Sequence, residues 1–377
     1  MIDIIKTLCS YTACAIHQKD CQLTIESEQA FFTFAKENGL IPMVYETIDH
    51  QSISDGFKKH LKKHFYAFVA HDTQSLSYIN QVDEILNKNE IKHIFLKGSI
   101  LKHLYPKTYY RGMGDIDILI EDQDLKKVHE IFKQNHIILK HASDQHDSFL
   151  INEQMPIEIH PKLYKDFNKK YASLFTDPWL YAKKIDQYHY RFDSSFEIVY
   201  LLYHLAKHLD TSGIGLRSLL DIGIYLNAHQ DDIQKEKLLS FLKTADMVKF
   251  FTQMVYLNIK YFDFKNLDEF LFDDLLNDQA YDRIIELFAT SGIHGTGSSH
   301  NPFSTRIAAS QMKNKSKFIV FISILFPNFK SMVGMYPFLR KTPFLLPFLW
   351  VFRWLKLLLI RTKSTIKKLF QFKAAKS

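Results

Sequence analysis

The sequence predicts an α+β protein, in which a small mixed β-sheet core lies between an N-terminal helical region and a C-terminal helical domain. Residues 1–89 carry apolar side chains at the three- and four-residue spacing of amphipathic helices. Between residues 90 and 193, short apolar runs and period-two alternation indicate strands. Residues 194–291 return to helical spacing, and residues 292–377 form a basic, aromatic-rich tail. We take these four segments as the expected domain organisation.

The N-terminal region is expected to be a set of helices that pack against the sheet. Ser27 can cap one helix by accepting a backbone N–H, and Gly39 can end it. A long helix is expected over Ile53–Asn87. Its apolar positions are Leu61, Phe65, Phe68, Val69, Leu76, Ile79, Val82 and Leu86.

The core begins with a strand, a tight turn and a short helix. The largely apolar run Ile91–Leu96 predicts a buried strand. Gly98 and Ser99 then turn the chain into a helix over Ile100–Tyr105, which Pro106 stops. The backbone N–H groups of such a turn can receive a phosphate. The turn is therefore a candidate phosphate site.

A second strand, Asp115–Ile120, carries two carboxylates on one face. Because side chains alternate along a strand, Asp115 and Asp117 point to one side, and Ile116 and Ile118 point into the core. Such a pair suits Mg²⁺, which prefers oxygen ligands. By itself the pair is more often a solvated strand edge.

The rest of the core supplies a third carboxylate. A helix capped by Asp124 is expected to run to about Asn135. Three short strands follow, at Ile137–Lys140, Ser148–Asn152 and Pro156–His160. On the last strand, Glu158 and His160 share a face. If this strand lies beside the Asp115–Ile120 strand, Glu158 completes a group of three carboxylates. His160 either orients Glu158, binds metal, or is a surface histidine.

This combination of strand, Gly-Ser turn, helix and Asp-apolar-Asp strand resembles the nucleotidyltransferase superfamily related to DNA polymerase β. More narrowly, it is similar to a family described as uncharacterised nucleotidyltransferases. The matching positions are Lys97, Gly98, Leu101, Tyr105, Arg111, Asp115–Leu119 and Glu158–His160. Ser99 departs from that family, in which alanine is common, and is closer to the Gly-Ser of the superfamily.

The resemblance implies a nucleotidyltransferase core, a nucleoside triphosphate such as ATP as donor, and Mg²⁺ or Mn²⁺ as cofactor. The implied catalytic and metal-binding residues are Asp115, Asp117 and Glu158. The implied nucleotide-binding residues are Lys97, Gly98, Ser99 and Arg111. Lys97 and Arg111 could equally be surface charges.

The helical domain adds candidate substrate contacts. His204 and His208 lie four residues apart, as do Arg217 and Asp221. Two histidines at this spacing can bind zinc, but the glutamate of a metalloprotease helix is missing between them. Hydrogen-bonded histidines at a helix interface are the alternative. The resemblance extends to this region and implies that His160, His204, His208 and Arg217 contact substrate or phosphate.

The tail is unusually basic. Fifteen of the 48 lysines and arginines follow Glu286, whereas all 41 acidic residues end with it. Helices are expected over Ser316–Phe326 and Phe348–Gln371. Arg353 and Lys356 interrupt the second apolar run, so a membrane-spanning helix is not expected. The tail either packs on the body of the protein or lies on an anionic membrane surface.

The cysteines and the first residues favour a cytoplasmic protein. Cys9, Cys14 and Cys21 form neither an even set nor a zinc-binding pattern, which indicates free thiols in a reducing compartment. Asp3 and Lys6 interrupt the first apolar segment, so no secretory signal is recognised. Attachment to the inner face of the membrane through the tail is compatible with this location.

The expected activity is transfer of a nucleoside monophosphate from a Mg²⁺-bound triphosphate to a hydroxyl group of an acceptor. The sequence does not choose among a small molecule, a sugar, a protein and an RNA as acceptor. Two alternatives remain: an inactive nucleotide- or partner-binding protein, and a peripheral membrane protein that acts through its tail. Since neighbouring carboxylates repel, Asp117→Asn is expected to remove activity without lowering stability in the absence of Mg²⁺.

Overall fold

The computed structural model describes residues 1–143, 146–163, 174–211, 213–295 and 297, together with 326–327, 329, 332–333 and 336–354. Residues 1–313 form one compact unit and residues 314–377 form another. Most of the helix expected over Ser316–Phe326, and the part of the Phe348–Gln371 helix beyond Trp354, lie outside the described residues.

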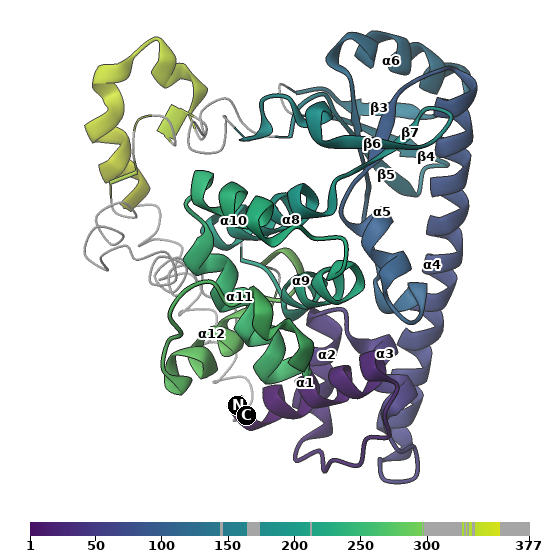
Figure 1. The fold of residues 1–377 in the computed structure, drawn as a ribbon, viewed down its shortest axis with the longest axis vertical. Coiled ribbons are helices and arrows are strands. Elements are labelled where there is room, and N and C mark those ends of the chain that lie inside the picture. The colour runs from purple at the N-terminus through teal and green to yellow at the C-terminus, as the bar shows by residue number, and fades with distance from the viewer. Residues whose placement is uncertain are drawn as a thin grey trace, which may run out of the picture. The chain divides into compact units, whose positions relative to one another are not determined.

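The N-terminal region is helical, as predicted, and Figure 1 shows its long helix α4 extending from the first helices to the sheet. The four helices are α1 (Ile2–His17), α2 (Glu28–Glu37), α3 (Ile41–Thr47) and α4 (Asp55–Lys88). Ser27 caps α2 by accepting the backbone N–H of Ala30, and Gly39 follows its end with φ +67°. The predicted long helix is confirmed by α4.

Seven strands of the described chain form one mixed sheet in the order β3-β4-β5-β2-β1-β7-β6. They are β1 (His93–Phe95), β2 (Ile116–Ile120), β3 (Ile138–His141), β4 (Asp147–Ile151), β5 (Met155–His160), β6 (Ala182–Asp186) and β7 (His189–Phe192). The mixed α+β class is therefore confirmed. The hairpin of β6 and β7 was not among the predicted strands, because its short charged sequence lacks a clear apolar alternation.

Short helical segments connect the strands. They are α5 (Gly98–Leu101), η1 (Lys102–Leu104), η2 (Thr108–Tyr110), η3 (Asp122–Asp124), α6 (Leu125–Gln134) and η4 (Pro178–Tyr181). The helix predicted after Ser99 is thus a single α-turn that continues as a 3₁₀ turn. Asp124 precedes α6 as predicted, but its side chain makes no capping hydrogen bond.

The C-terminal helical domain packs beside the sheet (Figure 1). Its elements are α8 (Ser194–Thr211), α9 (Leu216–His229), α10 (Lys235–Thr244), α11 (Val248–Phe262), η5 (Lys265–Phe270), α12 (Asp278–Ser291) and η6 (Ile293–Gly295). The backbone N–H of Ser195 donates to Asp193 Oδ1 at 3.1 Å. Asp193 therefore caps α8.

The two sheet faces are buried against different helices. Ile116, Ile118 and Ile120 share an apolar core with the C-terminal half of α4 and with α6. Leu119 and Ile94 belong to a second core, formed with the N-terminal helices and α8–α12. Because side chains alternate along β2, Asp117 lies on the same face as Leu119. The apolar residues of β2 thus place its aspartate toward the helical domain.

The described part of the second unit contains η7 (Pro337–Arg340) and η8 (Pro343–Leu345), followed by helical residues 346–354. Within the described residues, no helix is both long enough and apolar enough to cross a membrane.

Candidate active site

The carboxylates of β2 and β5 meet because the two strands are parallel neighbours. Asp117 pairs with Glu158 in the strand register, so their side chains project from the same face. Oxygens of both residues and a ring nitrogen of His160 lie within 4.8 Å of one another. This group does not include Asp115, which directly precedes β2 and lines the same cavity. The predicted neighbouring arrangement of the two strands is confirmed.

Two cationic or polar side chains hold Asp117. Lys97 Nζ and His160 Nε2 both lie 2.7 Å from Asp117 Oδ1. Burial alone would raise the pKa of Asp117, but Lys97 and His160 outweigh it and hold that pKa far below its usual range. Lys97 has a φ of +51°, which a residue with a side chain rarely adopts. The side chain of Lys97 is only 16% exposed, so it is held against Asp117 and away from solvent.

The pKa of Asp115 is shifted in the opposite direction to that of Asp117. Burial and the neighbouring charge of Asp117 raise the pKa of Asp115 to about 6. This carboxylate is thus short of positive charge, unlike Asp117. Glu158 has a lowered pKa, chiefly through His160, which lies 3.6 Å from its Oε2. Carboxylate oxygens in this arrangement are the donors that Mg²⁺ and Mn²⁺ prefer, so the residues fit such an ion.

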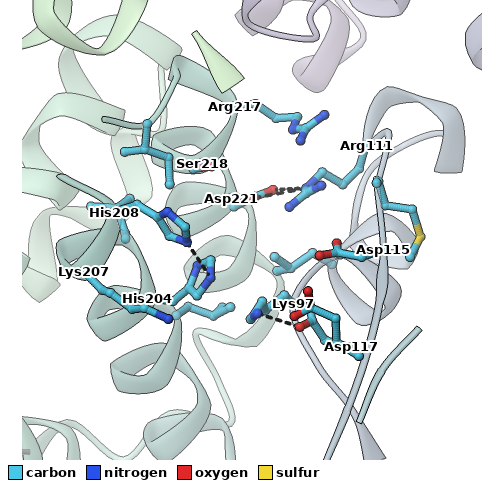
Figure 2. A pocket seen from close by; sticks show the side chains of 18 of the residues that line it. Lys97, Arg111, Asp115, Asp117, His204, Lys207, His208, Arg217, Ser218 and Asp221 are labelled. Atoms are coloured by element: carbon cyan, nitrogen blue, oxygen red, sulfur yellow. Dashed lines mark hydrogen bonds and ion pairs between the residues drawn. The ribbon is translucent and has the colours of Figure 1, made fainter. Parts of the chain in front are cut away.

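The carboxylates open into a cavity of about 320 Å³ between the sheet and helices α8 and α9. Figure 2 shows Asp115 and Asp117 on its sheet side and His204 and His208 on its helix side. The predicted residues that line it are Lys97, Gly98, Arg111, Asp115, Asp117, Glu158, His160, His204, His208 and Arg217. One cavity therefore gathers all the predicted site residues except Ser99.

Ser99 lies elsewhere. Its side chain lines a second cavity, and its backbone N–H donates to Leu96 O at 3.3 Å. The backbone N–H of Ile100 likewise donates to Lys97 O. The expectation of a free backbone N–H at Ser99 is thus wrong, because this N–H closes a turn onto Leu96. A Cβ on Gly98 would lie 3.2 Å from Met113 Cβ, so glycine is needed for close packing.

Asp221 pairs with Arg111 and not with Arg217, the residue four positions before it on α9. Arg111 Nε contacts Asp221 Oδ1 at 2.8 Å, and Tyr105 donates to the same oxygen at 2.8 Å. The expected i, i+4 pair of Arg217 and Asp221 is wrong, because Arg111 reaches Asp221 from the opposite side of the cavity (Figure 2).

Arg217 is consequently a buried cation that forms no ion pair with a carboxylate among the residues that the structure describes. It is 7% exposed, and its Nε has no hydrogen-bond partner within the described structure. Burial and the nearby Arg111 lower the pKa of Arg217 to about 9. A buried charge that lacks a partner is costly. An anion in this cavity would supply the missing charge.

The histidines of α8 contact each other, with 3.0 Å between His204 Nε2 and His208 Nε2. Burial and the charge of Lys97 lower the pKa of His204 well below its usual value, so its ring is neutral. Sequence reasoning missed His146, which lies 3.5 Å from Glu158 Oε1. No local pattern marks this residue, since only the pairing of β4 with β5 brings it to the site.

The fold and site together define an α+β protein in which three carboxylates and several cations face one cavity. The family described as uncharacterised nucleotidyltransferases matches residues 26–263, and the chain belongs to that family. This segment includes every predicted site residue.

The chain also resembles the solution structure of the antibiotic-resistance factor ANT(2'')-Ia, with a TM-score of 0.35 and 10% sequence identity. The match covers 45% of this chain and 90% of that one. A likeness this distant supports no inference about activity. A search of curated proteins found no match.

Proposed function

We propose that the protein transfers a nucleoside monophosphate from a Mg²⁺-bound nucleoside triphosphate to a hydroxyl group of an acceptor. The observation that carries this proposal is the pairing of Asp117 with Glu158 on parallel strands, beside Asp115. These carboxylates face a cavity that also contains Arg217, whose Nε has no hydrogen-bond partner among the described residues. Family membership supports the same class of reaction.

In this proposal Asp115, Asp117 and Glu158 hold the metal. When bound, Mg²⁺ would neutralise the charge that develops on the phosphates. Lys97 and His160 keep Asp117 ionised and fix its orientation through bonds to a single oxygen, Oδ1. Glu158 has a lowered pKa and is ionised near neutral pH, so it would either share a metal ion or take the proton of the acceptor hydroxyl.

The cations on the helix side bind the phosphates in this proposal. Arg217 is the principal candidate, because it is buried and its Nε is unpaired within the described residues. Arg111 is already neutralised by Asp221 and acts by orienting the surrounding loop. His204 and His208 border the remaining space and are candidate contacts for the acceptor.

The test is a transfer assay with each of the four α-labelled nucleoside triphosphates, Mg²⁺ and a panel of sugars, antibiotic-like small molecules, proteins and RNAs. We expect label transfer and pyrophosphate release from the wild type, and loss of both in Asp115→Asn. Asp122→Asn is the matched control, because this exposed aspartate on η3 lies outside the cavity. A wild type that binds Mg²⁺-triphosphate but transfers no label to any acceptor would favour the inactive binding protein.

A second candidate function is attachment to an anionic membrane through the tail. Phe344, Phe348 and Phe352 are 54–71% exposed and lie at four-residue spacing on one side of a helical segment. Trp350 and Trp354, on the other side, pack on Phe326. The chain after Glu286 contains fifteen basic and no acidic residues. Exposed phenylalanines in such a basic segment are typical of a helix that lies in a membrane surface.

Membrane attachment is tested by sedimentation of the full chain with vesicles. We expect binding to vesicles containing phosphatidylserine, weaker binding to phosphatidylcholine vesicles, and loss of binding at high salt. Phe348→Ser should weaken binding more than Leu275→Ser, an exposed apolar residue of the first unit. Equal effects of the two changes would contradict a membrane-binding role of this helix.

A further inference from the structure

A second group of metal-ligating side chains lies on the other face of the sheet. Asp83 from α4, His93 from β1 and His189 from β7 place their ligand atoms within 4.8 Å of one another. His93 pairs with Ile120 in the register of β1 and β2, so it shares the face of Ile120 and not that of Asp117. The group is therefore separate from the carboxylates of the candidate active site.

Both histidines converge on one carboxylate oxygen. His93 Nε2 lies 2.8 Å from Asp83 Oδ1, and His189 Nδ1 lies 3.2 Å from the same atom. The two strands pair directly at these residues, which places the imidazole rings 5.0 Å apart. The group thus forms from three distant parts of the chain, because β1 pairs with β7 and α4 packs against both strands.

The contacts of His93 indicate which of its ring nitrogens can bind a metal ion. Its Nδ1 lies 2.8 Å from the carbonyl oxygen of Ile91, so Nδ1 carries a proton and donates it. In a neutral ring, Nε2 then presents a lone pair toward Asp83. Metal-binding histidines commonly have this arrangement, in which the second nitrogen donates to a backbone carbonyl.

The three ligand atoms surround one point beside the sheet. His93 is fully buried, so an ion bound to its Nε2 would be shielded from solvent on that side. A divalent cation placed between the three atoms would be bound by all of them. At zinc bond lengths, neighbouring ligand atoms lie about 3.4 Å apart, a small expansion of the observed 2.8 and 3.2 Å.

We propose that Asp83, His93 and His189 bind a zinc ion that ties α4 to the β1 and β7 strands. Two imidazole nitrogens and one carboxylate oxygen are a donor set typical of zinc, whereas Mg²⁺ prefers oxygen ligands alone. Asp83 and His189 line a second cavity of about 350 Å³, so the remaining coordination position faces this cavity.

The second cavity contains an independent sign of a polar occupant. Ser99 is 4% exposed and lines this cavity, and its Oγ has no hydrogen-bond partner within the described structure. Glu197 lines the same space, and burial raises its pKa to about 8, which makes it a hydrogen-bond donor near neutral pH. A metal-bound water or small ligand would find polar partners there.

The test uses the full chain after removal of metal with a chelator. Titration with Co²⁺, a spectroscopic substitute for zinc, should give visible absorption bands of a four-coordinate site that saturate at one ion per chain. Added Zn²⁺ should abolish these bands and raise the melting temperature. His189→Gln should weaken Co²⁺ affinity by at least about tenfold. It should also remove the zinc-dependent rise in melting temperature.

Three variants distinguish this site from other binding. His103→Gln changes a histidine that lines the same cavity outside the group, so its Co²⁺ bands should match those of the wild type. His204→Gln and Asp115→Asn alter the candidate active site and should also leave the bands intact. Bands that persist in folded His189→Gln and disappear in His204→Gln would overturn the proposal, as would the absence of saturable bands from the wild type.

Discussion

Neighbouring carboxylates of the candidate active site differ because their surroundings supply different amounts of positive charge. Asp117 contacts both Lys97 and His160, whereas Asp115 has no ion-pair partner within the described structure. One carboxylate is therefore stabilised in its ionised form, and the other is destabilised. The two residues should respond oppositely to loss of charge, although they lie on the same face of the chain.

Asp115→Asn should stabilise the metal-free protein near pH 7.5. The folded pKa of Asp115, about 6, exceeds its ordinary value of 3.8. Its contribution to stability is therefore present at low pH and is lost as the pH rises through 6. Replacing Asp115 by the neutral asparagine should therefore raise the free energy of unfolding by on the order of 2 kcal/mol at pH 7.5. The gain should shrink toward pH 4, and melting curves of both proteins between pH 4 and 8 measure it.

Asp117→Asn should instead destabilise the protein, contrary to the expectation from the sequence. Lys97 is 16% exposed at its side chain and would lose the carboxylate that neutralises it. Breaking a buried pair from one side costs about 3–5 kcal/mol. Chemical denaturation without Mg²⁺ measures this loss. The double variant Lys97→Met/Asp117→Asn should regain much of the stability, and a failure to do so would remove the ion pair as the cause.

At the scale of elements, α9 delivers charge to the cavity from the helical domain. Asp221 reaches Arg111 across the cavity, and Arg217, one turn earlier, remains unpaired at its Nε within the described residues. Arg217 lies close to the backbone at Gly39, because a Cβ on this glycine would be only 2.9 Å from Arg217 Nη1. Helix α9 thus supplies Asp221, which is paired with Arg111, and Arg217, whose Nε can bind an anion.

Arg217→Met should separate anion binding from folding. Methionine keeps much of the length of the side chain and removes a charge that burial disfavours, so the ligand-free melting temperature should stay the same or rise. Pyrophosphate should raise the melting temperature of the wild type, because a ligand that binds only the folded state stabilises it. This rise should be mostly lost in Arg217→Met. Arg283→Met, at an exposed position of α12, should keep it.

At the scale of the whole molecule, the two compact units divide the proposed activities. All residues of the candidate active site lie within residues 1–313, and the exposed phenylalanines of the tail lie within residues 314–377. The family match also ends before the second unit begins. Nucleotide binding and membrane attachment should therefore be separable.

A protein that ends at Lys313 should retain stabilisation by Mg²⁺-triphosphate and lose binding to anionic vesicles. At a ligand concentration 100 times the dissociation constant, the stabilisation should be about 2.7 kcal/mol. Melting curves with and without ligand, and vesicle sedimentation, measure the two properties on the same samples. Loss of both properties in a folded shortened protein would show that the tail is needed for the active site.

Local sequence patterns determined most of the fold. Helix α4 follows from an apolar spacing that extends over most of its 34 residues, and β2 and β5 follow from short alternating runs. The same alternation fixed which face of β2 and of β5 carries Asp117 and Glu158. These features depend on residues that are close in sequence, for which backbone geometry dictates the outcome.

Only the tertiary structure decided how the charges are paired. Arg111 bonds to Asp221, 110 positions away, in place of the Arg217 that helical spacing offers. Lys97 forms an ion pair with Asp117, whereas Ser99 lines a different cavity. Long flexible side chains reach several partners, and burial makes the choice among them strongly dependent on which element lies opposite. Sequence spacing along one helix or strand contains no information about that opposing element.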